Sequence, residues 1–293
     1  MDTMTIGIIA NIDKPKAGEI LGSLMLVLER HDLDVVVEEN SARLLNSSIE
    51  KPVAFDEMGE HVDLIIVLGG DGTILNAARR LGAQRKPLMG INIGALGFLT
   101  YTNQHSLDKV GEWIVNHHYR LSPRAMIEVS VHGAGDEDSP TYYGLNEATV
   151  SRGSVSRIIQ LETRIGGEFV NNYNADGLIV ATPTGSTAYS LSAGGPIIDP
   201  ESGVFVITPI CPHALSNRSM IVADSAEVEI IPVKPRDQVI LTIDGRTLQD
   251  IEPGASVRVK RSPWKVELAF LPDQSFYRTI RQKLHWHGSN IQV

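Results

Sequence analysis

Residues 62–73 have the sequence Val-Asp-Leu-Ile-Ile-Val-Leu-Gly-Gly-Asp-Gly-Thr, in which a nearly continuous apolar run meets a glycine-rich corner. An apolar run without alternation is typical of a central parallel strand that is covered on both faces. We therefore predict a strand over 62–68 and a helix over about 75–81. Because ligands bind beyond the carboxyl ends of strands in open α/β sheets, the corner at 69–73 is a candidate site.

The rest of the first 121 residues continues this pattern on both sides of the corner. Short apolar runs alternate with helix-length amphipathic stretches, as expected of an α/β domain with a parallel sheet. The predicted strands are residues 6–9, 35–37 and 88–92, and the predicted helices are residues 17–30 and 106–118.

The pattern changes near Leu121-Ser122-Pro123, after which short β-branched or alternating runs are separated by Gly, Pro and Asp-Gly turns. This pattern is typical of an all-β domain, and we expect a sandwich-like one over 122–270. A tail, 271–293, follows, with a predicted helix over 276–286. The predicted strands of the β domain are residues 126–131, 148–151, 158–165, 178–180, 204–208, 220–222, 228–231, 239–243 and 257–259.

Composition and charge exclude several classes of protein. The chain has 293 residues, with 26 Lys and Arg against 35 Asp and Glu, which gives a net charge of −9. A nucleic-acid partner is therefore not expected, since such proteins usually carry a basic excess. The longest apolar runs are far shorter than a membrane span, so no membrane partner is expected. The single cysteine, Cys211, excludes an internal disulfide, is predicted to be buried or half-buried, and fits a cytoplasmic protein.

Asp71 places a carboxylate in the corner at 69–73. Glycine backbone and the N-terminus of a helix favour anions such as phosphate, which a carboxylate would repel. The carboxylate makes sense if Asp71 orients or deprotonates an attacking hydroxyl, or helps to hold Mg²⁺. The alternative is a simple βα turn in which Gly-Asp-Gly satisfies backbone dihedral angles, and these five residues alone leave both interpretations open.

A second candidate is the segment 182–195, in which nine of fourteen residues are Gly, Ser or Thr. Small hydroxyls and glycines form a close-fitting polar surface for a nucleotide, and the preceding strand and Pro183 argue against a disordered linker. Asn146-Glu147 provides an amide and a carboxylate for a base edge or a ribose, although such pairs are common on surfaces. Asp176-Gly177 opens a strand, and Asp244-Gly245 is predicted to close a β-hairpin.

Taken together, Gly-Gly-Asp-Gly-Thr at 69–73, Asn146-Glu147 and the string Thr-Pro-Thr-Gly-Ser-Thr-Ala-Tyr-Ser-Leu-Ser-Ala-Gly-Gly-Pro at 182–196 resemble the bacterial NAD kinases. The first motif is shared with diacylglycerol, sphingosine and phosphofructo-kinases and marks only a superfamily. The long string is far more specific. The stretch from Gly90-Ile91-Asn92 to Gly97-Phe98-Leu99 also fits the family.

The resemblance implies a fold, a reaction and an assembly. The fold would be that of the NAD kinase and diacylglycerol kinase superfamily, with a tail that returns to the first domain. The active site would lie between domains and take residues from a neighbouring subunit, within a homodimer or homotetramer. The reaction would transfer the γ-phosphoryl group of ATP to the adenosine-ribose 2′-hydroxyl of NAD, giving NADP and ADP, with Mg²⁺ or another divalent ion.

The resemblance also implies roles for individual residues. Asp71 matches the proposed general base and Gly72 the backbone beside it, while Asp176 matches a contact to the nicotinamide half. Asn146 and Glu147 match the pair that holds the adenosine half. Residues that match the nucleotide-lining loop are Thr184, Thr187, Ala188, Tyr189, Ser190, Leu191 and Ser192. Residues where this chain or its relatives vary are Arg157, Asn174 and Arg246: some members place basic contacts at the first two, and relatives often have Gln at the third.

Two other functions remain open. A lipid kinase of the same superfamily would need an apolar acyl groove and a basic membrane-facing patch, which the net charge of −9 and the polar loop do not favour. A non-catalytic NAD(P)-sensing module is disfavoured by Asp71, because a pure binder gains nothing from a carboxylate beside phosphate.

Overall fold

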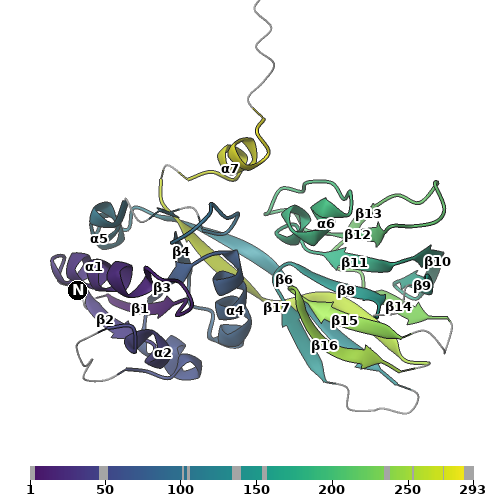
Figure 1. Ribbon diagram of the computed structural model, residues 1–293, viewed down its shortest axis with the longest axis horizontal. Coiled ribbons are helices and arrows are strands. Elements are labelled where there is room, and N and C mark those ends of the chain that lie inside the picture. The colour runs from purple at the N-terminus through teal and green to yellow at the C-terminus, as the bar shows by residue number, and fades with distance from the viewer. Residues whose placement is uncertain are drawn as a thin grey trace, which may run out of the picture. The chain divides into compact units, whose positions relative to one another are not determined.

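The computed structural model describes residues 4–45, 52–100, 102–103, 106–133, 140–153, 157–233, 238–252, 254–272 and 274–286. The chain divides into two compact units. Unit 1 consists of residues 1–123 together with residues 266–293, and unit 2 consists of residues 124–265. Unit 1 contains most of the helices together with a set of strands, whereas unit 2 is built mainly of strands (Figure 1).

Unit 1 is built on a parallel sheet with the strand order β2-β1-β3-β4. The last residues of β17, a long strand that spans Ser256–Phe270, join the sheet where Leu268 pairs with Leu88. From β1 the chain passes to β2 on one side and then to β3 on the other, so the order reverses between β1 and β3. The strands are β1 (Thr5–Ala10), β2 (Asp34–Val37), β3 (Leu64–Gly69), β4 (Leu88–Asn92) and β5 (Thr102–Asn103), which pairs with β4.

Helices cover this sheet. In α1 (Ala17–Glu29), Ile20, Leu21, Leu24 and Leu28 follow helical spacing and are buried. They share one core with β1, β3, β4 and α5 (Leu107–Val115), and α1 and α5 lie side by side (Figure 1). The remaining helices are α2 (Glu39–Ala42), α3 (Met58–His61), α4 (Asp71–Leu81) and α7 (Phe276–Lys283), with 3₁₀ turns at Phe55–Glu57 and Gly82–Gln84. None of the helices that the structure describes is long and apolar enough to cross a bilayer.

Helix α4 begins at Asp71, four residues before the start predicted from the sequence. Gly70 is its N-cap in an extended conformation, with φ −115° and ψ −170°. A carboxylate in the first turn is favourable because the exposed N–H groups there carry partial positive charge. The glycines of the corner thus bring the chain directly from β3 into the helix, and Asp71 is the first helical residue.

Unit 2 is a β-sandwich, as the sequence predicted. One sheet has the antiparallel order β13-β12-β11-β8-β15-β16. The strands that face it include β9, β14 and β17, and the side chains of both layers form one core. The first sheet consists of β8 (Glu147–Arg152), β11 (Gly177–Ala181), β12 (Val204–Ile210), β13 (Met220–Ala223), β15 (Val239–Ile243) and β16 (Arg246–Ile251). The facing strands are β6 (Arg120–His132), β7 (Thr141–Gly144), β9 (Ile159–Ile165), β10 (Glu168–Ala175), β14 (Val228–Pro232) and β17.

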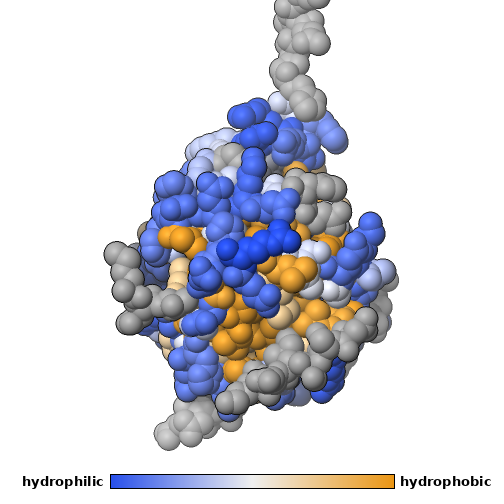
Figure 2. Space-filling view, turned by 90° about the vertical axis from the view of Figure 1, so that its left-hand side faces the viewer, coloured by the Kyte–Doolittle hydropathy of each residue, from blue (hydrophilic) through white to orange (hydrophobic). Residues whose placement is uncertain are grey.

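Part of the surface of the molecule is apolar. Figure 2 shows the face at the left of Figure 1, where hydrophobic residues gather between hydrophilic ones. Exposed large apolar side chains of unit 1 include Leu26 of α1, which is 56% exposed, and Val115 of α5, which is 44% exposed.

The prediction of a buried or half-buried thiol at Cys211 is wrong. Cys211 is exposed, because it lies directly after β12 in a turn where its φ is +45°.

Candidate functional site

A cavity of about 320 Å³ opens in unit 1 at the point where the strand order reverses. This is where ligands bind in open α/β sheets, since the loops after neighbouring strands diverge there. Asn11 and Asp13 follow the carboxyl end of β1, and Gly72 and Thr73 follow that of β3. The Asn11 side-chain amide donates to Thr73 Oγ1 at 3.4 Å. Of the corner at 69–73, Gly72 and Thr73 line this cavity.

Two further residues of this cavity were missed by the sequence analysis. Asn76 and Arg80 lie one and two turns into α4 and line the same space. The Arg80 guanidinium lies 3.9 Å from the centroid of the Phe55 ring and donates to Asp56 Oδ1 at 2.9 Å. The helical spacing from Gly72 through Asn76 to Arg80 is the signal that could have found both residues, because residues four apart share one helix face.

The glycine corner leaves backbone open at the start of α4. A Cβ on Gly69 would collide with the Thr73 side chain, so this glycine is required for packing. A Cβ on Gly70 or Gly72 would meet nothing within 4 Å. The first N–H groups of a helix have no acceptor within the helix and attract anions. The corner therefore offers backbone donors to a ligand with no side chain in front of them.

The Asp71 carboxylate is held by the loop that follows β4. The Phe98 N–H donates to Asp71 Oδ2 at 2.8 Å, and the Leu99 N–H donates to Oδ1 at 2.9 Å. The Thr100 hydroxyl lies 3.4 Å from Oδ1. A Cβ on Gly97 would collide with the carboxylate. These contacts fix the orientation of Asp71 and leave Oδ2, which accepts one hydrogen bond, a second lone pair for a hydroxyl or a cation.

In unit 2, Asn146 and Glu147 are held by a residue that the sequence assigned only to a turn. The Asp244 carboxylate accepts the N–H groups of Leu145, Asn146 and Glu147 at 2.8, 2.8 and 3.1 Å. Asp244 has φ +48° and, with Gly245, closes the hairpin between β15 and β16, as predicted. The hairpin therefore also fixes the backbone of the Asn-Glu pair, which the sequence analysis missed.

The Ser/Thr-rich segment packs directly against this pair. Thr182 Oγ1 donates to the Leu145 carbonyl at 2.6 Å, and the Thr182 N–H donates to the Asn146 carbonyl at 2.8 Å. A Cβ on Gly185 would collide with that same Asn146 carbonyl. Segments some forty residues apart in sequence thus form one cluster, as neighbouring strands β8 and β11 require.

Glu147 has an unusual environment. It is 5% exposed, and burial together with the negative charge of Asp244 raises the pKa of its carboxyl to about 8. The Tyr189 N–H donates to it and opposes that shift in pKa. Among the described residues, its Oε2 has no hydrogen-bond partner. Glu147 is therefore protonated near neutral pH and able to donate a hydrogen bond to a ligand oxygen.

The segment itself is not the single helix-length piece predicted over 187–193. It forms a 3₁₀ turn, Gly185–Thr187, followed by a one-turn helix α6, Tyr189–Ser192. Ser190 is fully buried, and its hydroxyl pairs with Thr208 Oγ1 at 2.9 Å, which stabilises the segment from within. Tyr189 is 47% exposed, and the buried hydroxyl of Thr184 has no hydrogen-bond partner among the described residues.

Asp176 lies at the opposite end of the same strands. Its Oδ1 forms an ion pair with Arg152 Nε at 2.9 Å. Arg152 is the last residue of β8, and at this end of the two strands Ser151 pairs with Gly177, the first residue of β11. Glu147 and Ala181 pair at the other end, about 17 Å away at the usual rise of an antiparallel strand. A single chain therefore does not bring Asp176 to the Glu147 cluster. Three other predicted site residues are exposed: Arg157, Asn174 and Arg246.

Comparison with known proteins decides the family. The model of the ATP-NAD kinase N-terminal domain matches residues 6–119, and that of the ATP-NAD kinase C-terminal domain matches residues 145–271. The chain belongs to the NAD kinase family. The NAD kinase of Natranaerobius thermophilus is 39% identical over 283 residues, covering 96% of this chain and 97% of its own. That of Carboxydothermus hydrogenoformans is 40% identical over 275 residues, covering 94% and 97%.

Solved structures of the family have the same fold. The yeast NADH kinase complexed with NADH superimposes with a TM-score of 0.88 at 26% identity, covering 99% of this chain and 90% of that one. The NAD kinase of Archaeoglobus fulgidus in complex with ATP gives a TM-score of 0.73 at 24% identity, covering 97% of this chain and 100% of that one. The fold class predicted from the sequence is confirmed.

Proposed function

We propose that the protein is a phosphotransferase that transfers the γ-phosphoryl group of ATP to the adenosine-ribose 2′-hydroxyl of NAD. The supporting observation is the Asp71 carboxylate, which belongs to an anion-favouring corner and is fixed by two backbone N–H groups. The bond between the γ-phosphorus and the β,γ-bridging oxygen breaks while the 2′-oxygen forms the new bond to phosphorus. The hydroxyl proton passes to Asp71, and NADP and ADP leave.

In this proposal the cavity at the β1/β3 reversal takes the phosphates of ATP. The open backbone at Gly70 and Gly72 supplies N–H donors, and Arg80 supplies the one positive charge among the described lining residues. Phosphoryl transfer depends mainly on positioning and on neutralising charge, so few basic side chains are needed.

A divalent cation fits this site only as a companion of ATP. The described residues contain no group of three or more His, Cys, Asp or Glu that could hold a metal ion. Mg²⁺ is usually held by one or two carboxylates together with substrate phosphates, and Asp71 is the carboxylate that would serve. When bound, such an ion supplies charge neutralisation on the transferred phosphoryl group.

The adenosine half of NAD is proposed to bind in unit 2. Among the described residues, the buried Glu147 Oε2 and the buried Thr184 hydroxyl have no hydrogen-bond partner. In this proposal a ribose hydroxyl and the edge of the adenine make these hydrogen bonds. Asn146, Thr187, Ala188 and Tyr189 are the neighbouring contacts, with Leu191 and Ser192 behind them in α6.

We propose that Asp176 serves the nicotinamide half of a dinucleotide held by another copy of the chain. The separation of about 17 Å from Glu147 supports this, because the same copy does not place both residues on one half of the ligand. The apolar surface of Figure 2 supports a homodimer or homotetramer, since exposed apolar patches often mark interfaces. A cytoplasmic location is proposed from the single, exposed cysteine.

An assay with purified protein, NAD, ATP and Mg²⁺ tests the proposal against its two rivals. The formation of NADP in step with ADP supports an NAD kinase. ATP consumption only with a lipid diol would support a lipid kinase, and tight NAD binding without any product would support a sensing module.

A further inference from the structure

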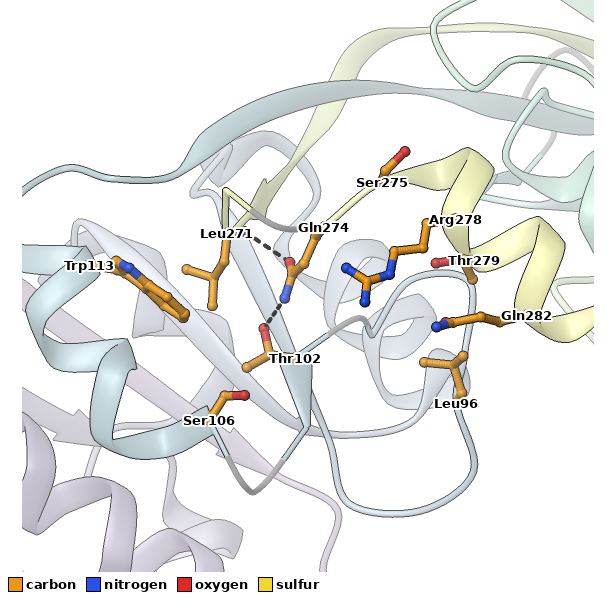
Figure 3. A pocket seen from close by; sticks show the side chains of 10 residues that line it. All are labelled: Leu96, Thr102, Ser106, Trp113, Leu271, Gln274, Ser275, Arg278, Thr279 and Gln282. Atoms are coloured by element: carbon orange, nitrogen blue, oxygen red, sulfur yellow. Dashed lines mark hydrogen bonds between the residues drawn. The ribbon is translucent and has the colours of Figure 1, made fainter.

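The loop that follows β4 and holds Asp71 is itself held at both ends. It leaves β4 at Asn92 and returns beside that strand as β5. At the β5 end, Thr102 Oγ1 accepts a hydrogen bond from the Gln274 amide at 2.7 Å, as Figure 3 shows. Leu96, near the middle of the loop, lines the cavity drawn in the same figure. The C-terminal piece of unit 1 therefore contacts the loop at more than one point.

Asn92, the last residue of β4, holds the other end of the loop from within. It is 5% exposed, and its side-chain amide makes three hydrogen bonds, all to the loop. The Oδ1 atom accepts the Gly94 N–H at 2.6 Å, while Nδ2 donates to the Ala95 carbonyl at 2.7 Å and to Thr100 Oγ1 at 2.9 Å. Neither the family resemblance nor the proposed reaction assigns a role to Asn92.

These three contacts determine the direction of the Thr100 hydroxyl. An amide oxygen only accepts and its NH₂ group only donates, so the Gly94 N–H and the Ala95 carbonyl fix which end of the amide is which. The Nδ2 atom therefore donates to Thr100, and the hydroxyl hydrogen points to another acceptor. That acceptor is Asp71 Oδ1 at 3.4 Å, a contact longer than the usual roughly 2.5–3.0 Å of such bonds.

The two carboxylate oxygens of Asp71 consequently differ. Oδ1 accepts the Leu99 N–H at 2.9 Å and faces the Thr100 hydroxyl, and a Cβ on Gly97 would collide with it. Among the described residues, Oδ2 accepts only the Phe98 N–H, at 2.8 Å. Because a carboxylate oxygen accepts about two hydrogen bonds, Oδ1 is fully used and Oδ2 keeps one free lone pair.

We propose that Asn92 is a positioning residue that orders the loop and the Thr100 hydroxyl, so that Oδ2 of Asp71 is the oxygen that takes the 2′-hydroxyl proton. This inference rests on the proposed function. The O–H bond breaks, its electron pair forms the new bond to phosphorus, and the proton passes to Oδ2, while the bridging oxygen leaves with ADP. Without the Asn92 amide, the Thr100 hydroxyl could turn away and the N–H groups of the loop would no longer be fixed.

Asn92→Asp and Thr100→Val test this role through the split between kcat and KM. The first variant keeps the size of the side chain and the acceptor for the Gly94 N–H but has no N–H to donate, and the second removes the hydroxyl at nearly the same shape. We expect both to lower kcat for NADP formation by about ten- to a hundredfold, as a displaced reacting group does, with little change in KM for NAD or ATP. Thr100→Ser keeps the hydroxyl and should retain most of kcat.

Combination with Asp71→Asn separates positioning from a loss of stability. If Asn92 and Thr100 act through Asp71, Thr100→Val should lower kcat no further in the Asp71→Asn protein. Leu28→Ala, in the core beneath α1, is the matched control. It should lower the midpoint of urea unfolding and leave the kcat of the folded enzyme unchanged.

Hydrogen exchange measured by mass spectrometry tests the order of the loop without turnover. Asn92→Asp should speed exchange in peptides that cover 94–100 and leave those that cover 204–210 unchanged. Unchanged exchange in 94–100 would overturn the proposal, whatever the protein phosphorylates.

The kinetic outcomes that would overturn the proposal are equally specific. They are wild-type kcat in both Asn92→Asp and Thr100→Val, an equal loss of kcat in Thr100→Ser or in Leu28→Ala, and a further loss when Thr100→Val is added to Asp71→Asn. A wild-type protein that forms no NADP would instead contradict the proposed function, and hydrogen exchange would then decide whether Asn92 orders the loop.

Discussion

At position 71 one carboxylate receives two backbone N–H groups, so its direction is set by the loop after β4 and not by its own helix. A sugar hydroxyl is a weak acid, and a carboxylate at hydrogen-bond distance is a suitable base for it. The same geometry makes the amide a poor replacement, since its NH₂ group would face the N–H of Phe98 or Leu99.

Asp71→Asn is expected to lower kcat by about 10²–10⁴-fold, the usual contribution of a general base. It should also lower the free energy of unfolding by about 1–3 kcal/mol, because one backbone N–H loses its acceptor. Steady-state NADP formation and urea denaturation measure the two effects. Asp108→Asn, at an exposed first-turn carboxylate of α5, is the control: it should leave kcat unchanged and lower the free energy of unfolding by less than about 1 kcal/mol. A variant with near-wild-type kcat would remove the base from the proposal.

Glu147 predicts an unusual dependence of stability on pH. Its pKa is 4.5 in an ordinary setting and about 8 in the folded protein. Between these values the folded chain keeps a proton that the unfolded chain has lost, so stability falls as pH rises and levels off above about pH 8. Each pH unit within this window costs at most about 1.4 kcal/mol.

Glu147→Gln should remove this dependence, because the amide imitates the protonated carboxyl. The stability of the variant relative to wild type is expected to increase from pH 5 to pH 9 in chemical denaturation. Taking the difference between the two proteins cancels the other titrating groups. A difference that stays constant across this range would show that Glu147 titrates normally.

Among the elements, the loop 94–100 depends on close packing at Gly97. A Cβ there would meet the Asp71 carboxylate and the Thr100 hydroxyl. We expect Gly97→Ala to lower the free energy of unfolding by about 1–3 kcal/mol, as overpacking does, and to reduce turnover by moving Asp71.

Gly22→Ala in α1 is the matched control for Gly97→Ala. Its Cβ would have only one neighbour, at 3.9 Å, and alanine favours a helix by about 0.5–1 kcal/mol. Thermal unfolding of both variants should therefore shift in opposite directions. Equal shifts would mean that the contact at Gly97 does not matter.

The sequence predicted those elements whose apolar pattern is strong. The strands at 88–92 and 239–243 have the predicted bounds. It missed β7, β10 and β16, whose many polar residues hide a clear apolar period of two. It also gave β17 only three of its residues, because Lys260-Arg261-Ser262-Pro263 interrupts the apolar pattern in the middle of a long strand.

Of the candidate site, the sequence predicted the corner at 69–73, the Asn-Glu pair and the Ser/Thr-rich segment, since each is local. It did not predict that Asp244 holds the Asn-Glu pair or that Phe98 and Leu99 hold Asp71. These contacts join residues about 98 and 27 positions apart. Every residue type except proline has the same backbone N–H donor, so the residue types at 98 and 99 do not indicate that these positions hold a carboxylate.

For the molecule as a whole, unit 1 is made from two separate pieces of chain. Leu268, Ala269 and Leu271 come from the far end and are buried in its core. Deletion of residues 266–293 should therefore unfold unit 1, since each fully buried leucine contributes about 1.5–3 kcal/mol. Loss of helical circular dichroism and rapid proteolysis within 4–123 would show this.

Leu268→Ala in the full chain is the milder companion to this deletion. It should cost about 2–5 kcal/mol and leave the helices intact at low denaturant. A truncated chain that keeps the full helical signal would mean that residues 4–123 fold without the C-terminal piece.

The most direct test of the account is the position of phosphate in the product made from NAD and ATP. Phosphorus NMR of the purified product should show one new phosphate monoester, coupled to the 2′-proton of the adenosine ribose, and none from Asp71→Asn under the same conditions. A phosphate on the 3′-hydroxyl, or unchanged product formation by Asp71→Asn, would contradict the proposed role of the carboxylate.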